Sequence, residues 1–94
     1  FVPLLVHHAR TTRSWPAVPK TIFTIHNLAF QGVFPARQWA LTNLPLEWFH
    51  VNSAEAWGQL NLLKGGVALA DAITTVSPRY AREICTPEYG CGLE

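Results

Sequence analysis

The sequence has little charge, almost no cysteine, no methionine and no long apolar run. Charged residues make up 14% of the 94 residues, whereas a soluble chain usually carries about a quarter. Such a small polar surface suggests a partner for this chain. The net charge is +1, far less basic than a nucleic-acid-binding domain requires, so we expect no nucleic acid. No apolar run approaches the roughly 18–20 residues that span a bilayer, so we expect no membrane.

The cysteines Cys85 and Cys91 are too few for a disulfide framework and lack the spacing of a structural zinc site. They point to a reducing compartment. His7 and His8 are poor metal ligands as a pair, because adjacent helical residues point in different directions. We therefore expect no metal and no cofactor. The first residue is Phe1 rather than Met, so we expect the chain to be a piece of something longer.

The composition is that of a chain that forms a hydrophobic core. Half of the chain is hydrophobic (49%), with four Trp and five Phe, and its length allows one small domain, residues 1–94, and excludes a second. Charge is unevenly spread. Residues 1–46 carry four cations and no acid, giving +4, and residues 47–94 carry three cations and six acids, giving −3. The basic half either faces an anionic ligand or is simply solvated.

Apolar spacing predicts the elements. Residues 1–10 are typical of the end of a buried helix, and residues 20–26 of a parallel strand covered on both faces. Residues 27–45 predict a long irregular connection with a helical turn near 36–41, followed by a short helix at 45–50. Residues 57–70 indicate the clearest helix, within which two adjacent glycines, 65 and 66, suggest close approach of another backbone.

A second β-branched run, residues 71–76, predicts another strand. Ser77 and Pro78 then provide an N-cap and a first-turn proline for a helix that ends near Ile84. A strand, a helix and a second strand in this order normally form a right-handed crossover between parallel strands, which places the chain in an α/β, doubly wound open sheet. Two strands are too few to complete such a sheet.

Ligands of open parallel sheets bind beyond the carboxyl ends of the strands. His26 and Asn27 follow the first strand and Ser77 follows the second. Position alone leaves open whether His26 meets a ligand or is a core histidine, and Asn27 equally suits a turn. Gln31 and Gly32 have the chemistry of a turn with one exposed amide. Three polar residues on the predicted helix 57–70 are expected to be solvated: Gln59, Asn61 and Lys64.

Four blocks together resemble bacterial glycogen synthases and plant starch synthases, and they cover about half of the chain. They are residues 20–35 (KTIFTIHNLAFQGVFP), 58–66 (GQLNLLKGG), 70–84 (ADAITTVSPRYAREI) and 86–94 (TPEYGCGLE). The resemblance implies a retaining glucosyltransferase that moves glucose from ADP-glucose to the non-reducing end of an α-1,4-glucan. It also implies a two-domain B-type glycosyltransferase fold, of which this chain is part of the N-terminal Rossmann-like domain.

By the same resemblance, His26 matches the histidine of the catalytic cleft, which contacts the donor glucose and helps stabilise the forming sugar cation. Asn27, Gln31 and Gly32 would shape the same lip of the cleft and bind substrate. The family's Lys-Xaa-Gly-Gly donor motif, its His-Asp-Trp-His segment and its C-terminal diphosphate clamp do not occur in these 94 residues. Alone, the chain is expected to be marginally stable, inactive and prone to self-association.

The alternative is a non-catalytic, truncated sugar-binding or association module of the same fold. A third possibility, a related enzyme with another nucleotide sugar, is disfavoured by the HNLAFQG block. The expected location is the bacterial cytoplasm, or the plastid in a plant.

Overall fold

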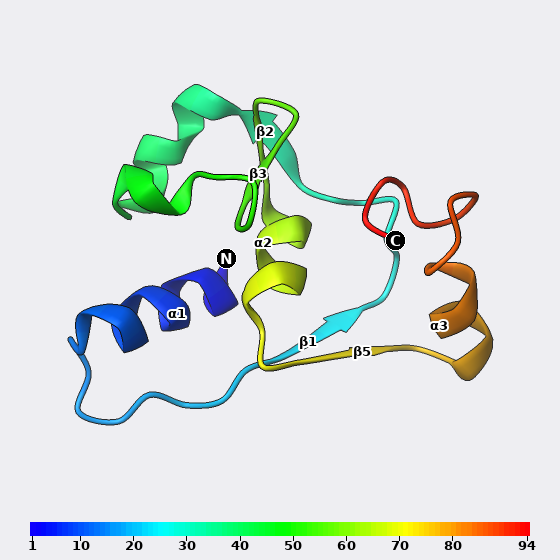
Figure 1. Ribbon diagram of the computed structural model, residues 1–94, viewed down its shortest axis with the longest axis horizontal. Coiled ribbons are helices and arrows are strands. Elements are labelled where there is room, and N and C mark those ends of the chain that lie inside the picture. Colours follow the sequence, from blue (N-terminus) through cyan, green and yellow to red (C-terminus); the bar gives the residue numbers. More distant parts are fainter.

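The computed structural model describes all residues from 1 to 94, and it is a flat molecule with extents of 39 × 30 × 17 Å. It is a mixed α/β structure with two small sheets (Figure 1). The elements in chain order are α1 (Val2–Thr12), β1 (Ile22–Ile25), β2 (Val33–Pro35), η1 (Ala36–Thr42), η2 (Leu46–Trp48), β3 (Glu55–Ala56), β4 (Gln59–Asn61), α2 (Leu62–Leu69), β5 (Ala72–Thr75) and α3 (Pro78–Glu83).

The two predicted parallel strands are confirmed. β1 pairs in parallel with β5, in a register that places Ile22 opposite Ala72 and Ile25 opposite Thr75. The expected cover on both faces is wrong for these residues, because of the β1 side chains only Ile25 is buried and Ile22 is 70% exposed. The physical reason is that the sheet has two strands, so each strand has one free edge and the faces lack further neighbours.

The predicted helix 57–70 is wrong in its first five residues. Trp57 and Gly58 form the turn of a hairpin between β3 and β4, and α2 begins only at Leu62. Asn61 caps α2, because its Oδ1 accepts the backbone N–H of Lys64 (2.9 Å). Leu60 does contribute to the core as its spacing suggested, but it does so from a strand.

The predicted irregular connection also contains a strand. β2 pairs antiparallel with β4, and β4 pairs antiparallel with β3, which makes a second sheet of order β2-β4-β3. The helical turn expected near 36–41 is confirmed as the 3-10 helix η1, and the short helix at 45–50 as η2. The helix at the start of the chain and the helix after Ser77 are confirmed as α1 and α3.

Two hydrophobic clusters lie on opposite sides of α2. The first joins α1, η1 and the second sheet through Leu4, Trp39, Ala54 and Leu60, and the second joins β1 to α2 through Ile25, Leu28 and Leu63. In Figure 1, α2 runs through the middle of the molecule, with α1 and the 3-10 helices on one side and β1, β5 and α3 on the other. α2 is therefore the element that both clusters share.

The two adjacent glycines of α2 allow this close packing. A Cβ on Gly65 would lie 3.1 Å from the Cβ of Ala54, and a Cβ on Gly66 would lie 2.6 Å from the Phe23 ring of β1. The predicted close approach is confirmed, although at Gly66 the neighbour is an aromatic side chain rather than a backbone. None of the helices combines the length and apolarity that crossing a membrane requires.

Candidate functional site

His26 lies where β1 ends, at the carboxyl edge of the parallel pair. Ile25 precedes it and is tied to β5, because Thr75 Oγ1 donates to the Ile25 carbonyl (2.6 Å). The His26 side chain is exposed and makes no hydrogen bond within the chain. A fixed backbone with an uncommitted imidazole can present either ring nitrogen to a ligand.

Asn27 holds the turn that follows. Its Oδ1 accepts the backbone N–H of Ala29 (3.0 Å), which is the local turn that Asn side chains commonly form. The next residue, Leu28, is buried, and its N–H donates to the Tyr80 hydroxyl of α3 (2.9 Å). The segment after His26 is thus fastened to α3, a contact that nothing in the sequence indicated.

Gln31 is fixed at both ends of its amide. Asn61 Nδ2 donates to Gln31 Oε1 (2.6 Å), and Gln31 Nε2 donates to the carbonyl of Cys91 (3.1 Å). Asn61 is 1% exposed, so the expectation that it is solvated is wrong. Lys64 is also engaged, because its Nζ donates to the Glu55 carbonyl; only Gln59 of the three is exposed as expected.

The backbone of the same loop caps α2. The N–H of Leu62 donates to the Gly32 carbonyl (3.1 Å), and that of Leu63 to the Gln31 carbonyl (2.9 Å). Gly32 has φ of 63°, a conformation that L side chains seldom adopt. Because three successive N–H groups of the helix end are satisfied in this way and by Asn61, the loop and α2 form one hydrogen-bonded unit.

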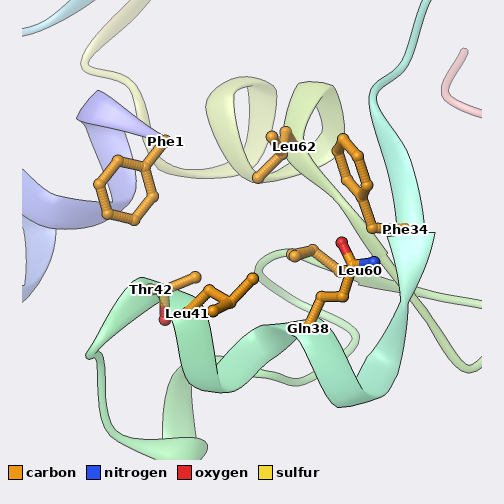
Figure 2. A pocket seen from close by; sticks show the side chains of 7 residues that line it. All are labelled: Phe1, Phe34, Gln38, Leu41, Thr42, Leu60 and Leu62. Carbon is orange, nitrogen blue, oxygen red and sulfur yellow. The ribbon is translucent and has the colours of Figure 1, made fainter.

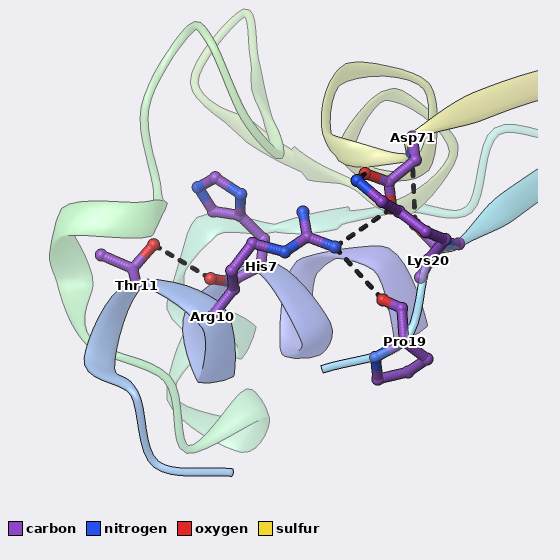
Figure 3. Close-up of polar contacts among 7 residues, drawn as sticks. His7, Arg10, Thr11, Pro19, Lys20 and Asp71 are labelled. Atoms are coloured by element: carbon purple, nitrogen blue, oxygen red, sulfur yellow. Dashed lines mark hydrogen bonds and ion pairs between the residues drawn. The ribbon is translucent and has the colours of Figure 1, made fainter. Parts of the chain in front are cut away.

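An ionic cluster holds the opposite, amino end of the parallel pair (Figure 3). Asp71 accepts the Thr21 N–H (2.8 Å) and an Arg10 N–H (3.1 Å), and Lys20 lies 3.5 Å away. The Thr21 amide and then the Arg10 guanidinium hold the pKa of the Asp71 carboxyl well below its usual range. Two of the four cations of the basic half are therefore used inside the chain.

The surface cavities do not coincide with the predicted site residues. A mainly apolar cavity of about 240 Å³ opens between the start of α1, η1 and β4 (Figure 2). A wider one of about 590 Å³ runs along β5 and the start of α3. The four residues predicted to form the site line none of the cavities: His26, Asn27, Gln31 and Gly32. No group of three or more metal-ligating side chains occurs.

The structure thus brings the predicted residues together as one loop, with His26 free and Gln31 engaged. Sequence reasoning missed Asn61 and Tyr80, which support this loop from α2 and α3. Asn61 could have been found by its type, since Asn immediately before an apolar helical run is an N-cap signal. Tyr80 carries no comparable signal.

Comparison with known proteins gives consistent matches. A family described as starch synthase catalytic domain matches residues 1–94. The glycogen synthase of Opitutus terrae is 53% identical over 93 residues, covering 99% of this chain and 19% of the relative. Glycogen synthases of Aquifex aeolicus and Alkalilimnicola ehrlichii are 55% and 57% identical over 80% and 81% of the chain. The chain spans less than a fifth of the length of these relatives, between 16% and 19%.

Proposed function

The chain belongs to the starch synthase catalytic domain family, and from that premise we propose that the native protein is a glycogen or starch synthase. It transfers glucose from ADP-glucose to the non-reducing end of an α-1,4-glucan with retention. The observation that carries this proposal is the similarity to glycogen synthases, which extends over nearly the whole chain. ADP-glucose and the glucan are its expected partners.

The fold is consistent with a larger α/β sheet. We propose that β1, α2, β5 and α3 are part of a Rossmann-like, doubly wound N-terminal domain in a two-domain enzyme. The parallel pairing of β1 with β5, with α2 between them in sequence, supports this arrangement. The exposed apolar side chains of the two strands support it as well, because strands of such sheets are normally covered on both faces.

His26 is the proposed catalytic residue. A residue at the carboxyl end of a parallel strand lies where open sheets bind ligands, and the free imidazole of His26 can contact the donor glucose there. Its ring would stabilise the positive charge that forms on the sugar. Asn27, Gln31 and Gly32 are proposed to shape the lip around it, and their turn and capping bonds support that role.

In this proposal, the chain supplies residues that act on the sugar and not on the diphosphate leaving group. Breaking a glycosidic bond to a diphosphate needs charges placed in advance on both the sugar and the leaving group. The chain spans less than a fifth of the length of its relatives, and we propose that the diphosphate is held by residues of the native protein outside this sequence. The free cysteines Cys85 and Cys91 on the surface support a reducing compartment for the enzyme, such as a cytoplasm.

The test is transfer of labelled glucose from ADP-glucose to glycogen by the native protein and two histidine variants. His26→Ala should lower turnover by about a hundredfold or more, the usual loss when one stabilising group is removed from a transition state. His50→Ala is the control, because His50 is also exposed but lies outside the loop. Normal turnover of a folded His26→Ala protein would remove His26 from the site. Glucan binding with no transfer by the unmutated protein would favour the non-catalytic module.

A further inference from the structure

The hairpin between β3 and β4 turns through an unusual pair of residues. Ala56 pairs with Gln59, so the turn consists of Trp57 and Gly58 alone. Both have positive φ, 49° and 77°, which is the geometry of a type I′ hairpin turn. Gly suits its position. Trp does not, because a bulky side chain rarely adopts a left-handed backbone, and this position normally favours Asn, Asp or Gly.

Neither the backbone nor the core explains why Trp occupies this position. Trp57 is 77% exposed, so it is not retained for burial. A Cβ on Gly92 would lie 2.6 Å from the indole, so the glycine at this position leaves room for the edge of the ring. A residue that disfavours its own turn and remains in solvent is best explained by a function of its side chain.

The turn is also held rigidly. Glu55 Oε1 accepts the Gly58 N–H across the turn (2.7 Å), and Lys64 of α2 donates to the Glu55 carbonyl. These bonds anchor the hairpin to the helix at the centre of the molecule. The indole is therefore presented from a fixed base, which lowers the ordering cost of binding a ligand.

Next to the ring is a cavity of about 270 Å³ with mixed chemistry. Apolar surface is provided by Val51, Trp57 and Leu93, and charged groups by Glu55 and Lys64. The Lys64 ammonium and the Glu55 carboxylate each retain hydrogen-bonding capacity beyond the bonds described. An aromatic face beside a few polar groups matches a pyranose ring, which has an apolar C–H face and a rim of hydroxyls.

We propose that Trp57 and this cavity form an accessory binding site for an α-glucan chain, in which the indole stacks on a glucose ring. Glu55 and Lys64 would bind hydroxyls of the same chain. The proposal rests on the proposed function, because a long polymeric acceptor can be held away from the point of transfer. The cavity shares no residue with the loop of His26, so the site is separate from the proposed catalytic residue.

The experiment measures the apparent Kd of the native protein for soluble glycogen by affinity electrophoresis, which needs no turnover. Trp57→Ala should weaken binding about three- to tenfold, the usual range for loss of an aromatic contact, and Trp57→Phe should retain most of it. Trp15→Ala is the matched control, because Trp15 is an exposed Trp on another segment. Unchanged glycogen binding by Trp57→Ala would overturn the proposal.

A second variant separates binding from packing. Trp57→Asn places a residue suited to the turn at this position, so we expect an unchanged or higher Tm together with the same loss of glycogen binding. A marked fall in Tm for both Trp57→Ala and Trp57→Asn would instead show that another segment or protein covers the ring, and would overturn the proposal. If the unmutated protein and every variant fail to transfer glucose, while Trp57→Ala and Trp57→Asn weaken glycogen binding and Trp15→Ala does not, the accessory site stands and the proposed transferase function does not.

Discussion

Hydrophobic side chains are buried to different extents on the two sides of α2. On the side of α1, the 3-10 helices and the second sheet surround a cluster in which Leu4 and Ala54 are almost fully buried. On the side of the parallel pair, Ile22 and Ile73 are exposed although both lie in apolar strands. The first side is closed by contacts among elements of this chain. The second has the sequence of a buried sheet without the neighbours that bury it, so its exposed apolar side chains indicate where further elements would pack.

The largest expected effect tests this difference directly. Leu4→Ala should lower the free energy of unfolding by about 2–5 kcal/mol, because it leaves a cavity in the closed cluster. Ile22→Ala removes a similar side chain from the exposed strand and should cost at most about 0.5 kcal/mol in this 94-residue chain. Urea unfolding of both variants gives the values.

Measuring the same two variants in the native protein tests whether the difference between the two sides of α2 persists there. An equal loss for Ile22→Ala and Leu4→Ala there would show that the face of β1 that carries Ile22 is covered, and the exposed sheet would then be a property of the 94 residues alone.

A smaller effect is expected at Asn61, which links α2 to the loop after His26. Asn61→Ala should cost about 1–3 kcal/mol, because it removes the N-cap of α2 and leaves Gln31 Oε1 without its donor. Asn61→Asp keeps the cap, but it buries a carboxylate oxygen against Gln31 Oε1, so it should cost at least as much. Gln59→Ala is the control on the exposed face of β4 and should change unfolding little. Equal values for Asn61→Ala and Gln59→Ala would contradict the network.

The smallest effect concerns Asp71, which joins α1 to the amino end of the parallel pair. Its pKa is lower in the folded protein than the ordinary value of about 4, so its contribution to stability is present above that pH. The contribution declines as the pH falls below about 4 toward the folded pKa. Asp71→Asn should therefore be less stable than the unmutated protein at neutral pH, and the gap should narrow toward pH 3. Urea midpoints across this range measure it, and a gap that does not depend on pH would exclude the carboxylate as its cause.

Local signals in the sequence predicted those elements that depend on neighbouring residues. Ser77 and Pro78 specify the start of α3 by capping and by a fixed φ, and the structure follows them. The β-branched runs of β1 and β5 were equally clear. The error at 57–61 arose because the spacing of Leu60 and Leu63 suits a helix, although the two side chains enter different clusters. Strands of two or three residues contribute too little periodicity to outweigh such a pattern.

The candidate site also combines a feature that the sequence predicted with contacts that it did not predict. The position of His26 followed from the end of a strand, which is a local feature. The bond between Asn61 and Gln31 joins residues 30 positions apart, and the one between Leu28 and Tyr80 joins residues 52 apart. Periodicity and composition carry no information on such contacts. They become visible only when the chain is folded.

The double attachment of the loop after His26 has a consequence for how its length can vary. Ordinary surface loops tolerate inserted and deleted residues, because their ends are fixed but their course is not. Here the Leu28 N–H is bound to α3, and the carbonyls of Gln31 and Gly32 are bound to the first N–H groups of α2. One added residue between these points would break the attachment to one of the two helices. Natural variation of this segment should therefore occur by substitution, with its length unchanged.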